Sequence, residues 1–388
     1  MSGANTRLKY VTRFAYGEPL PTDELQDGPI PVFGSNGQFA NFSRANTGSP
    51  AIIVGRKGSY GKVNWTDEAC FASDTTFVVD ERTTSHHLRW IYWLLQALEL
   101  DTGSDEAAVP GLNRDKAYER EVLLPDLETQ EATASFLDFE AQAVDSLIEA
   151  KQKLLGLLAE KRRTLVAEAV MRGLDRSAPL RPSGIDWLGD IPAHWEVERS
   201  RWLFNERDER SETGEEEMLT VSHITGVTPR SQKDVNMFEA ETTAGYKLCF
   251  TGDLVINTLW AWMGAMGTAP VDGIVSPAYN VYTPGQRLLP AYVDALVRIP
   301  VFAQEVTRYS KGVWSSRLRL YPEGFFETFW PVPPLDEQEQ IVARIAEERV
   351  KIDKLATATE RSIGLLKERR SALIAAAVTG QIAIPEAA

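Results

Sequence analysis

Residues 127–170 read LETQEATASFLDFEAQAVDSLIEAKQKLLGLLAEKRRTLVAEAV, and residues 335–378 read LDEQEQIVARIAEERVKIDKLATATERSIGLLKERRSALIAAAV. The two segments align without a gap at a constant shift of about 208 residues, with roughly 16 of 44 positions identical. Self-similarity over this length indicates a duplicated architecture. The sequence therefore predicts two halves of similar plan, each ending in one copy of this segment.

Each copy has the features of one long helix. It opens just after proline, at Pro125 in the first copy and at Pro333 and Pro334 in the second, and then lacks proline for about 40 residues. Apolar residues recur at spacings of 3, 4 and 7, which predicts a narrow apolar stripe along the helix. The matched stripe positions are Leu137 with Ile345, Val144 with Ile352, Leu147 with Leu355, Leu158 with Leu366, and Leu165 with Leu373.

Helices of this length need a partner. At about 1.5 Å per residue, each would be on the order of 60 Å long, far beyond the average helix of about 11 to 12 residues. The simplest partner for each copy is the other copy, in a coiled-coil spacer. The alternative is that two long helices cross ordinary globular cores.

The sequence before each helix indicates a globular half of mixed secondary structure. Short apolar strands alternate with helices rich in aromatic residues or valine, which favours α+β domains. We expect strands at residues 51–54, 76–79, 254–256 and 281–282, helices at 87–100 and 290–309, and a linker at 172–184. Residues 7–11 resemble residues 199–203, which supports the same plan in both halves.

Composition limits the class of protein. With 388 residues and 43% hydrophobic content, the chain can form two or three domains with cores of their own. Its net charge of -14 argues against a free-standing DNA-binding protein, which usually needs a basic domain. Cys70 and Cys249 lie far apart and indicate neither a disulfide framework nor a zinc site. No apolar run reaches the roughly 20 residues that span a bilayer, so we expect a cytoplasmic protein without membrane contact.

The segments that open the two helices resemble a known family. Residues 124–130 (LPDLETQ) and 332–338 (VPPLDEQ) are similar to the paired conserved regions of Type I restriction-modification specificity subunits, the HsdS family. Residues 184–195 (GIDWLGDIPAHW) resemble the start of a target recognition domain in that family. The first half lacks the corresponding Trp-Leu-Gly-x-Ile-Pro segment, which leaves the edge of its recognition domain less defined. Further similar stretches are residues 32–37, 55–59, 111–114, 219–222 and 226–227.

The resemblance implies an architecture. It is an α+β fold with two pseudo-repeated α/β target recognition domains, separated by two long antiparallel coiled-coil helices. The implied domains are residues 1–124 (first recognition domain), 125–172 (first helical spacer), 173–198 (linker and start of the second half), 199–332 (second recognition domain) and 333–381 (second helical spacer).

The resemblance also implies a function and partners. Each recognition domain would read one half of a split target in double-stranded DNA, and the helices would set the unread spacer. The helices would also dock two methyltransferase (modification) subunits, which carry S-adenosylmethionine and methylate adenine, while separate motor-nuclease (restriction) subunits cut DNA. The chain itself is then expected to be non-catalytic and to bind no cofactor and no metal.

Cationic and polar loops in the first half are candidates for DNA contact, because phosphates need Arg, Lys or backbone amides and base edges need paired donors or acceptors. The glycine-rich loop 55–62 carries Arg56, Lys57, Ser59, Tyr60 and Lys62, with a solvated hairpin tip as the alternative. The turn at Ser35 and Asn36 can contact bases or be a simple hairpin. Asn113 and Arg114 suit adenine and guanine, or form a turn before the first long helix.

The second half has its own candidates. The segment 311–319 interleaves cations, hydroxyls and an indole, which suits a loop facing a DNA groove. Trp260 and Trp262 flank one alanine, and either contact DNA or pack in the core. The candidate residues are Lys311, Trp314, Arg317, Arg319, Trp260, Trp262, Asn257, Ser222 and His223, of which the histidine has an equally simple structural interpretation.

Enzyme motifs do not explain these loops. The loop at Gly55 is not a Walker motif, because five residues separate Gly55 from Gly61 and Val63 stands where Ser or Thr is required. His86 and His87 have no Cys or acidic companion at metal-ligand spacing. The rival interpretation is a non-catalytic coiled-coil scaffold that binds only other proteins. It accounts for the helices and the negative charge, but not for two divergent globular halves with cationic glycine loops.

Overall fold

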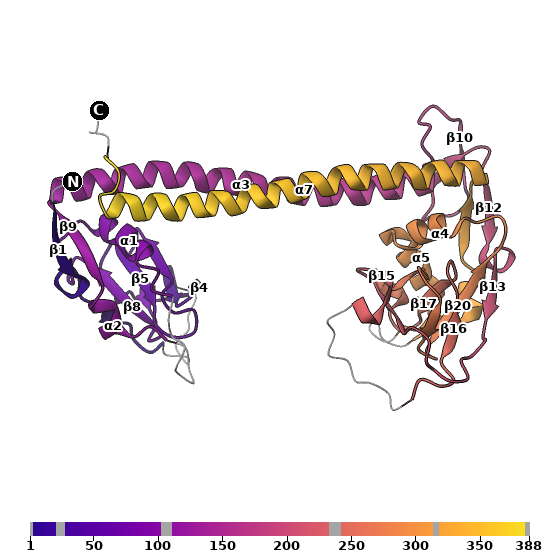
Figure 1. Cartoon of the computed structure of the whole chain (residues 1–388), viewed down its shortest axis with the longest axis horizontal. Helices are drawn as coiled ribbons and strands as arrows, with labels where there is room; N and C mark the ends of the chain where they lie inside the picture. Colours follow the sequence, from indigo (N-terminus) through magenta and orange to yellow (C-terminus); the bar gives the residue numbers. More distant parts are fainter. Residues whose placement is uncertain (1–2, 21–27, 102–110, 233–241, 313–317, 385–388) are drawn as a thin grey trace. The chain divides into compact units, whose positions relative to one another are not determined.

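The computed structural model describes residues 3–20, 28–101, 111–232, 242–312 and 318–384. The chain divides into two compact units. The first unit comprises Met1–Lys153 and Thr359–Ala388, and the second comprises Leu154–Ala358. Two long helices, α3 (Leu127–Arg172) and α7 (Leu335–Val378), each contribute one part to each unit (Figure 1). Both long helices predicted from the repeat are therefore confirmed.

The first unit is built around a four-stranded antiparallel sheet in the order β2-β8-β5-β6. A second sheet has the order β4-β3-β7, and β1 pairs with β9, which leads the chain into α3. The strands are β1 (Gly3–Arg7), β2 (Ala15–Tyr16), β3 (Ile30–Gly34), β4 (Gly37–Phe42), β5 (Ala51–Gly55), β6 (Val63–Thr66), β7 (Phe71–Ala72), β8 (Thr76–Asp80) and β9 (Glu121–Pro125), and the helices are α1 (Leu88–Ala97) and α2 (Arg114–Tyr118).

The second unit repeats this plan with a four-stranded antiparallel sheet in the order β13-β20-β17-β18. The pairs β10-β11, β12-β21, β14-β15 and β16-β19 surround it. The strands are β10 (Leu180–Pro182), β11 (Asp190–Pro192), β12 (Glu196–Arg199), β13 (Phe204–Arg207), β14 (Leu219–Ser222), β15 (Gly226–Pro229), β16 (Lys247–Cys249), β17 (Leu254–Asn257), β18 (Met266–Thr268), β19 (Gly273–Val275), β20 (Tyr279–Pro284) and β21 (Phe329–Val332), and the helices are α4 (Pro290–Val297), α5 (Pro300–Tyr309) and α6 (Pro322–Phe325).

The main sheets of the two globular halves correspond, and so do the strand pairs that precede the long helices. Strand β5 is central in the first sheet as β17 is in the second, and the pair β1-β9 corresponds to β12-β21 before each long helix. The similar segments 7–11 and 199–203 each form a short 3-10 helix, Leu8–Tyr10 and Ser200–Trp202. The repeat thus extends beyond the helices into halves whose sequences have diverged, which confirms the mixed helix and sheet fold class.

Within each unit, α3 and α7 pack in antiparallel directions. In the second unit, Arg162 of α3 pairs with Asp353 of α7, with Nη1 and Oδ1 3.3 Å apart. In the first unit, Arg370 of α7 pairs with Asp145 of α3 at 2.8 Å between Nε and Oδ1, as an ion pair without the alignment of a hydrogen bond. Arg162 and Arg370 are equivalent positions of the repeat, as are Asp145 and Asp353. The same ion pair therefore forms in both units, with the two helices exchanged.

The predicted apolar stripe is only partly buried. Leu137, Val144 and Leu158 of α3 and the equivalents Ile345 and Ile352 of α7 are less than 9% exposed. One matched pair of the predicted stripe is exposed, since Leu147 is 47% exposed and Leu355 is 48% exposed, and Leu165, Leu366 and Leu373 are only partly buried. A straight helix of 3.6 residues per turn drifts away from a strict seven-residue repeat, so not every leucine at this spacing faces the partner helix.

A buried glutamine near the start of each long helix ties that helix to its globular half. The Oε1 of Gln130 accepts from the His87 amide at 2.9 Å, and its Nε2 donates to the Pro125 carbonyl at 2.8 Å. Gln338 makes the same two contacts, with the Leu289 amide and with the carbonyl two residues before its own helix, both at 2.8 Å. Both side chains are at most 1% exposed. Because His87 precedes α1 and Leu289 precedes α4, these two helices are equivalent.

Two sequence expectations need correction. The helix expected at residues 290–309 is two helices, α4 and α5, because Pro300 lacks the amide hydrogen that a helix interior needs and instead opens α5. The expected linker at 172–184 is not wholly extended chain, since β10 pairs with β11 in a small antiparallel sheet. Its core neighbours Leu188 and Ile191 are buried in the second unit, which makes this segment part of that fold.

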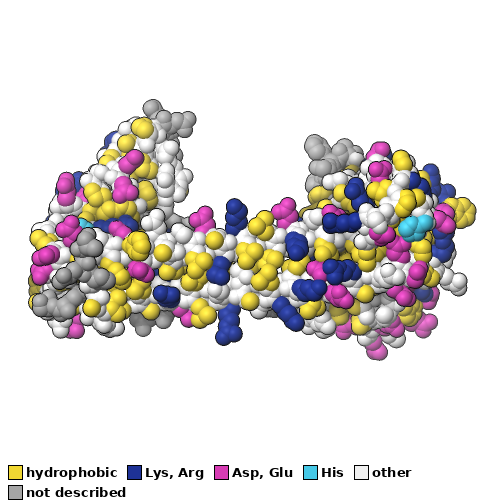
Figure 2. Space-filling model, turned by 90° about the horizontal axis from the view of Figure 1, so that it is seen from above, with side chains coloured by type: hydrophobic (Ala, Val, Ile, Leu, Met, Phe, Trp, Pro, Cys, Tyr) yellow, Lys and Arg dark blue, Asp and Glu magenta, His cyan; other side chains and the backbone are white. Residues whose placement is uncertain are grey.

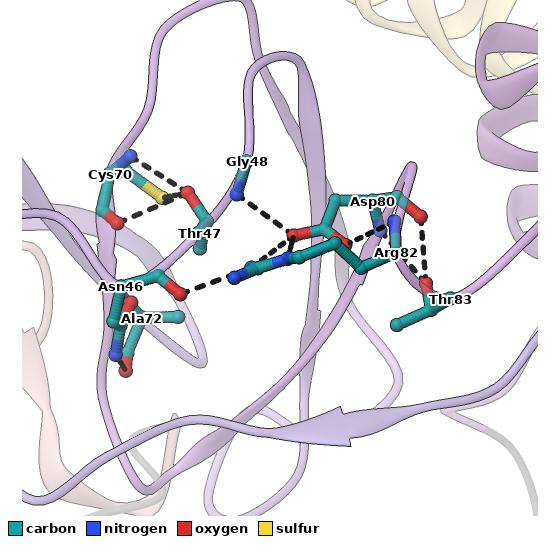
Figure 3. A network of polar contacts seen from close by, with 8 residues as sticks. All are labelled: Asn46, Thr47, Gly48, Cys70, Ala72, Asp80, Arg82 and Thr83. Atoms are coloured by element: carbon teal, nitrogen blue, oxygen red, sulfur yellow. Dashed lines mark hydrogen bonds and ion pairs between the residues drawn. The ribbon is translucent and has the colours of Figure 1, made fainter.

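A polar network holds the two main sheets of the first unit together (Figure 3). The carboxylate of Asp80, at the end of β8, is buried and accepts from the amides of Gly48 at 2.8 Å and Arg82 at 3.1 Å. Burial alone would raise the pKa of Asp80, but the hydrogen bonds from Arg82 and Gly48 lower it overall. Asn46 exchanges two hydrogen bonds with the backbone of Ala72 in β7, at 2.7 and 2.9 Å. The segment 46–48 is thereby fixed to strands of both sheets.

The two cysteines behave as the sequence predicts, since Cys70 and Cys249 are buried free thiols. Burial raises the pKa of the Cys249 thiol to about 12, so the thiolate is not formed near neutral pH. Across the described parts of the chain, no helix is both long and apolar enough to cross a membrane.

Candidate nucleic-acid interface

The loop 55–62 of the first unit is a closed turn built on glycine. The Gly55 amide donates to the Lys62 carbonyl at 2.8 Å, and the Gly61 amide donates to the Gly55 carbonyl at 2.8 Å. Gly61 has φ 76°, and a Cβ there would lie 2.2 Å from the backbone nitrogen of Asp101. Only glycine fits this position. The close turn leaves the side chains of Lys57 and Ser59 exposed.

The structure brings this loop against the turn that follows β3. The Nζ of Lys62 donates to both the backbone carbonyl and the Oδ1 of Asn36, each at 2.9 Å. Ser35, beside it, is only 8% exposed and donates from Oγ to the Thr75 carbonyl at 2.6 Å. Asn36 and Lys62 therefore present polar groups at one surface, while the Ser35 hydroxyl is occupied within the fold.

Residues 111–114 join the same surface. The Leu112 amide donates to the Arg56 carbonyl at 2.9 Å. The guanidinium groups of Arg56 and Arg114 lie 5.0 and 5.1 Å from the ring centre of Tyr16, which is 55% exposed. These distances fit cation–π contacts, which hold both cations at a defined place. We call Arg56, Lys57, Lys62, Arg114 and Tyr16 the first-unit cationic edge.

Sequence reasoning missed Tyr16 and misplaced one neighbour of the edge. Nothing in a lone tyrosine on a two-residue strand marks it as a platform for two arginines. Asn113 caps helix α2, its Oδ1 accepting from the amides of Asp115 and Lys116, both at 3.0 Å. The turn therefore precedes the short helix α2, not the first long helix, and the Asn113 side chain is engaged in the cap.

In the second unit, Lys311 and Arg319 lie opposite each other. Their backbones exchange two hydrogen bonds of 2.9 Å, and the Nε of Arg319 donates to the hydroxyl of Thr258 at 3.2 Å. Asn257, next to Thr258, is 7% exposed and donates to the Tyr279 hydroxyl at 3.2 Å. The candidates from residues 257 and 311–319 are thus brought together. Trp314 and Arg317 lie outside the described residues.

The tryptophan pair differs from ordinary core packing. Trp260 is 50% exposed, and its ring lies 6.3 Å from that of Trp262 with an angle of 19° between the planes. The Trp262 indole donates to the Leu259 carbonyl at 3.1 Å. A half-exposed indole stacked on a second one is an available flat surface.

Ser222 and His223 lie elsewhere in the second unit, at the turn between β14 and β15. The Oγ of Ser222 accepts from the amides of Ile224 and Thr225, at 3.2 and 3.1 Å, so it shapes the turn. His223 is exposed and lines a groove between this turn, α4 and the paired long helices.

This groove has a volume of about 680 Å³ and is lined by four arginines, Arg162, Arg163, Arg298 and Arg349, beside a single aspartate. We call it the arginine groove. Sequence reasoning passed over these residues, because a run such as Lys161-Arg162-Arg163 on a long helix is usually a solvated face. Figure 2 shows Lys and Arg side chains gathered along the helices at the end of the view that belongs to the second unit.

The outer faces of the long helices carry exposed leucines at matched positions. The matched pairs and their exposed fractions are Leu127 (58%) with Leu335 (48%), Leu147 (47%) with Leu355 (48%), and Leu157 (53%) with Leu365 (56%). Figure 2 shows apolar side chains along these helices. Leucines half exposed at the same positions of both copies indicate a surface that is repeated in the two units.

No protein-family model and no curated protein sequence matches the chain. Among solved structures, it is similar to the HsdS subunit of Thermoanaerobacter tengcongensis, with 15% identity, a TM-score of 0.52, and 98% of this chain and 97% of that chain covered. A chain from a structure on complex assembly and conformational transition of the type I R-M system gives 14% identity and a TM-score of 0.69, with 98% and 99% covered. The Type I S subunit from M. genitalium gives a TM-score of 0.40, too low to support an argument. The chain therefore has the fold of the specificity subunits of Type I restriction-modification systems.

Proposed function

We propose that the chain is the sequence-specific DNA-recognition subunit of a Type I restriction-modification complex. It reads a bipartite target and directs adenine methylation and DNA cleavage by partner subunits, without catalysing either. The observation that carries this proposal is the repeat of one sheet topology in two halves whose loops differ. A shared scaffold with different surface loops suits two domains that read different short sequences.

The first-unit cationic edge is the proposed contact surface of the first recognition domain. Arg56, Lys57 and Lys62 supply charge for backbone phosphates, and Arg114 supplies paired donors of the kind that read guanine. The stacking of Arg56 and Arg114 on Tyr16 limits their freedom before DNA arrives, which reduces the entropy lost on binding.

The second recognition domain offers a different set. Lys311 and Arg319 supply cations, and Trp260 and Trp262 supply a stacked aromatic surface. Asn257 lies next to Thr258, which binds Arg319, but its side chain is buried and bonds to Tyr279, so it supports this surface from within the fold. Different chemistry in the two units is what two different half-sites require.

The repeated leucines fit the proposed protein partners. Each pair of matched leucines has closely similar exposure in the two copies of the repeat. Two identical partner subunits need two equivalent docking surfaces, and the duplicated helices provide them. We therefore propose that two methyltransferase subunits dock on the long helices, with motor-nuclease subunits joining through the assembled complex.

The net charge of -14 fits a subunit that does not act alone. Binding to DNA depends strongly on neutralised phosphates, and the cationic residues of this chain are confined to a few surfaces. The isolated chain should bind DNA weakly, and the partner subunits should supply further phosphate contacts. This function places the chain with the host chromosome in the cytoplasm.

The test is methylome sequencing of a host that expresses this chain together with a methyltransferase subunit that co-purifies with it. We expect methyl-adenine at one split motif, present only when the chain is present. Replacing residues 1–124 with the matching domain of a related subunit should change one half of the motif and leave the other unchanged. A stable complex that produces no chain-dependent motif would favour the coiled-coil scaffold instead.

A further inference from the structure

The arginine groove has more positive charge than its own carboxylates neutralise. Arg162 pairs with Asp353 at 3.3 Å, and Arg298 pairs with Asp294 at 3.5 Å. The other two arginines, Arg163 and Arg349, have no carboxylate within ion-pair distance among the described residues. Burial, and then the nearby guanidinium groups of Arg162 and Arg298, lower the pKa of Arg349. Cations that are crowded in this way favour the binding of an anion.

Apolar residues of two helices line the groove. Ala291 and Ala295 of α4 face the groove, as do Val342, Ile345 and Ala346 of α7. The lining of the groove therefore combines apolar side chains with the four arginines. Apolar neighbours strengthen the interaction between the guanidinium groups and a bound anion.

The equivalent place in the first unit is closed. Arg89 and Trp93 of α1 occupy the positions that Ala291 and Ala295 hold in α4, by the register of the two buried glutamines. The Arg89 guanidinium and the Trp93 indole both donate to Asp138 of α3, each at 2.8 Å. These large side chains and their internal ion pair leave no excess charge to bind a ligand.

We propose that the arginine groove of the second unit binds phosphodiester groups of the DNA backbone beside the second half-site. The planar guanidinium group matches phosphate oxygens with two parallel donors, which suits this task better than lysine does. His223, at the exposed turn between β14 and β15 of the recognition domain, also lines the groove. This assignment rests on the proposed function of the chain and adds a site to it.

A docked partner protein fits the groove less well than DNA does. Two identical methyltransferase subunits on a duplicated helix pair would use equivalent surfaces in both units. The groove occurs in the second unit, whereas Arg89, Trp93 and Asp138 fill its counterpart in the first. DNA need not be contacted equally by the two units, because the two half-sites differ. The asymmetry of the site therefore favours DNA.

The test measures the salt dependence of DNA binding by the complex of the full chain with its methyltransferase subunit. Fluorescence anisotropy with a duplex carrying the methylated motif gives Kd at several salt concentrations. The double variant R163A/R349A should bind roughly tenfold or more weakly, on the motif and on a scrambled duplex alike. The slope of log K against log salt should become shallower by about two, about one for each phosphate that is no longer neutralised.

Two matched variants control for charge and for fold. Arg344 lies on the same helix outside the groove and pairs with Glu347 and Glu348, so R344A should keep the wild-type slope. R349K keeps the positive charge and should recover part of the affinity that R349A loses. Arg163 and Arg349 both keep solvent-exposed side chains, although Arg349 is partly desolvated, so their replacement should not unfold the unit.

Each outcome decides the assignment. If R163A/R349A left both the DNA affinity and the slope of log K against log salt unchanged, the assignment would be overturned. It would also be overturned if the double variant co-purified less methyltransferase while the slope stayed unchanged, because the groove would then be a protein-binding site. Titration of inorganic phosphate into the full chain separates a small-anion site. Tight phosphate binding that the double variant loses, with DNA binding unchanged, would also overturn the assignment. A wild-type complex without preference for any motif would instead contradict the proposed function, while the slope difference would still decide the groove.

Discussion

Helix α1 in the first unit and its equivalent α4 in the second each pack against the two long helices. The junction at α1 is filled by large side chains and is called solid, whereas the junction at α4 contains the arginine groove and is called open. In the first unit the Arg89 guanidinium lies 4.6, 4.5 and 5.3 Å from the ring centres of Trp65, Tyr92 and Trp93. In the second unit the matching face of α4 carries alanines, and the arginine groove takes the place of the aromatic cluster.

The two junctions share one contact, in which a buried glutamine side chain binds backbone groups of the globular half. Gln130 and Gln338 make the same hydrogen bonds to the start of α1 and of α4. A buried amide held at both ends fixes where the globular half begins relative to its helix, whatever fills the space behind it. The duplicated chain has therefore kept the glutamine that binds the backbone at both junctions, while the neighbouring side chains differ: Arg89 and Trp93 in the first unit, Ala291 and Ala295 in the second.

The largest expected effect on stability comes from a substitution in the solid junction of the first unit. W93A removes a side chain that is 3% exposed and leaves a cavity beside the long helices. We expect the free energy of unfolding of the first unit to fall by about 3–5 kcal/mol. Hydrogen exchange of peptides from α1, with denaturant unfolding of the full chain, measures it. W202A, at a tryptophan 73% exposed, is the control and should cost about 0.5 kcal/mol or less. Equal losses in the two variants would show that the cluster does not hold the junction.

A smaller effect is expected at the shared contact. Q338A leaves the Leu289 amide and the carbonyl groups of Arg287 and Pro333 without their partner, all of them hydrogen-bonded to Gln338 in the structure. Unpaired buried groups of this kind should cost about 2–3 kcal/mol. Faster hydrogen exchange at the start of α4, with little change in peptides of the first unit, measures it.

The control for this contact is Q340A, since Gln340 is exposed on the same helix and should have almost no effect. Q130A, which breaks the equivalent contact, should speed exchange at the start of α1 instead. If hydrogen exchange in Q130A or Q338A matched that of the wild type, the glutamine side chain would not be what holds the long helix to its globular half.

Much of the fold could be predicted from the repeat, because a seven-residue apolar pattern and flanking prolines act locally. The bounds of α3 and α7 agree with residues 127–170 and 335–378 to within two residues. Which leucines of the stripe are buried could not be predicted, since Leu147 and Leu355 depend on how the two helices drift around each other.

The candidate site was predictable where a loop carries its own signal. Glycines at 55, 58 and 61 mark the turn that exposes Lys57, and the structure brings Asn36 to Lys62 beside it. The platform made by Tyr16 and the arginine groove are assembled from segments far apart in the sequence. Arg162 and Arg298 become neighbours only because α4 is held against α3, which no local pattern shows.

The smallest effect on stability is expected from A295W. This variant tests directly whether the open groove is what distinguishes the second junction from the first. This substitution gives the second unit the residue that the first unit has at the equivalent position, Trp93. The indole enters a groove with a volume of about 680 Å³. The free energy of unfolding should change by about 1 kcal/mol or less, because room exists and overpacking strain is avoided. The indole should nevertheless exclude phosphate from the arginines, so the salt slope of DNA binding should fall as in R163A/R349A. A295V adds too little volume to close the groove and should keep the wild-type slope. A folded A295W complex with an unchanged slope would mean that the open junction differs from the solid one in packing alone.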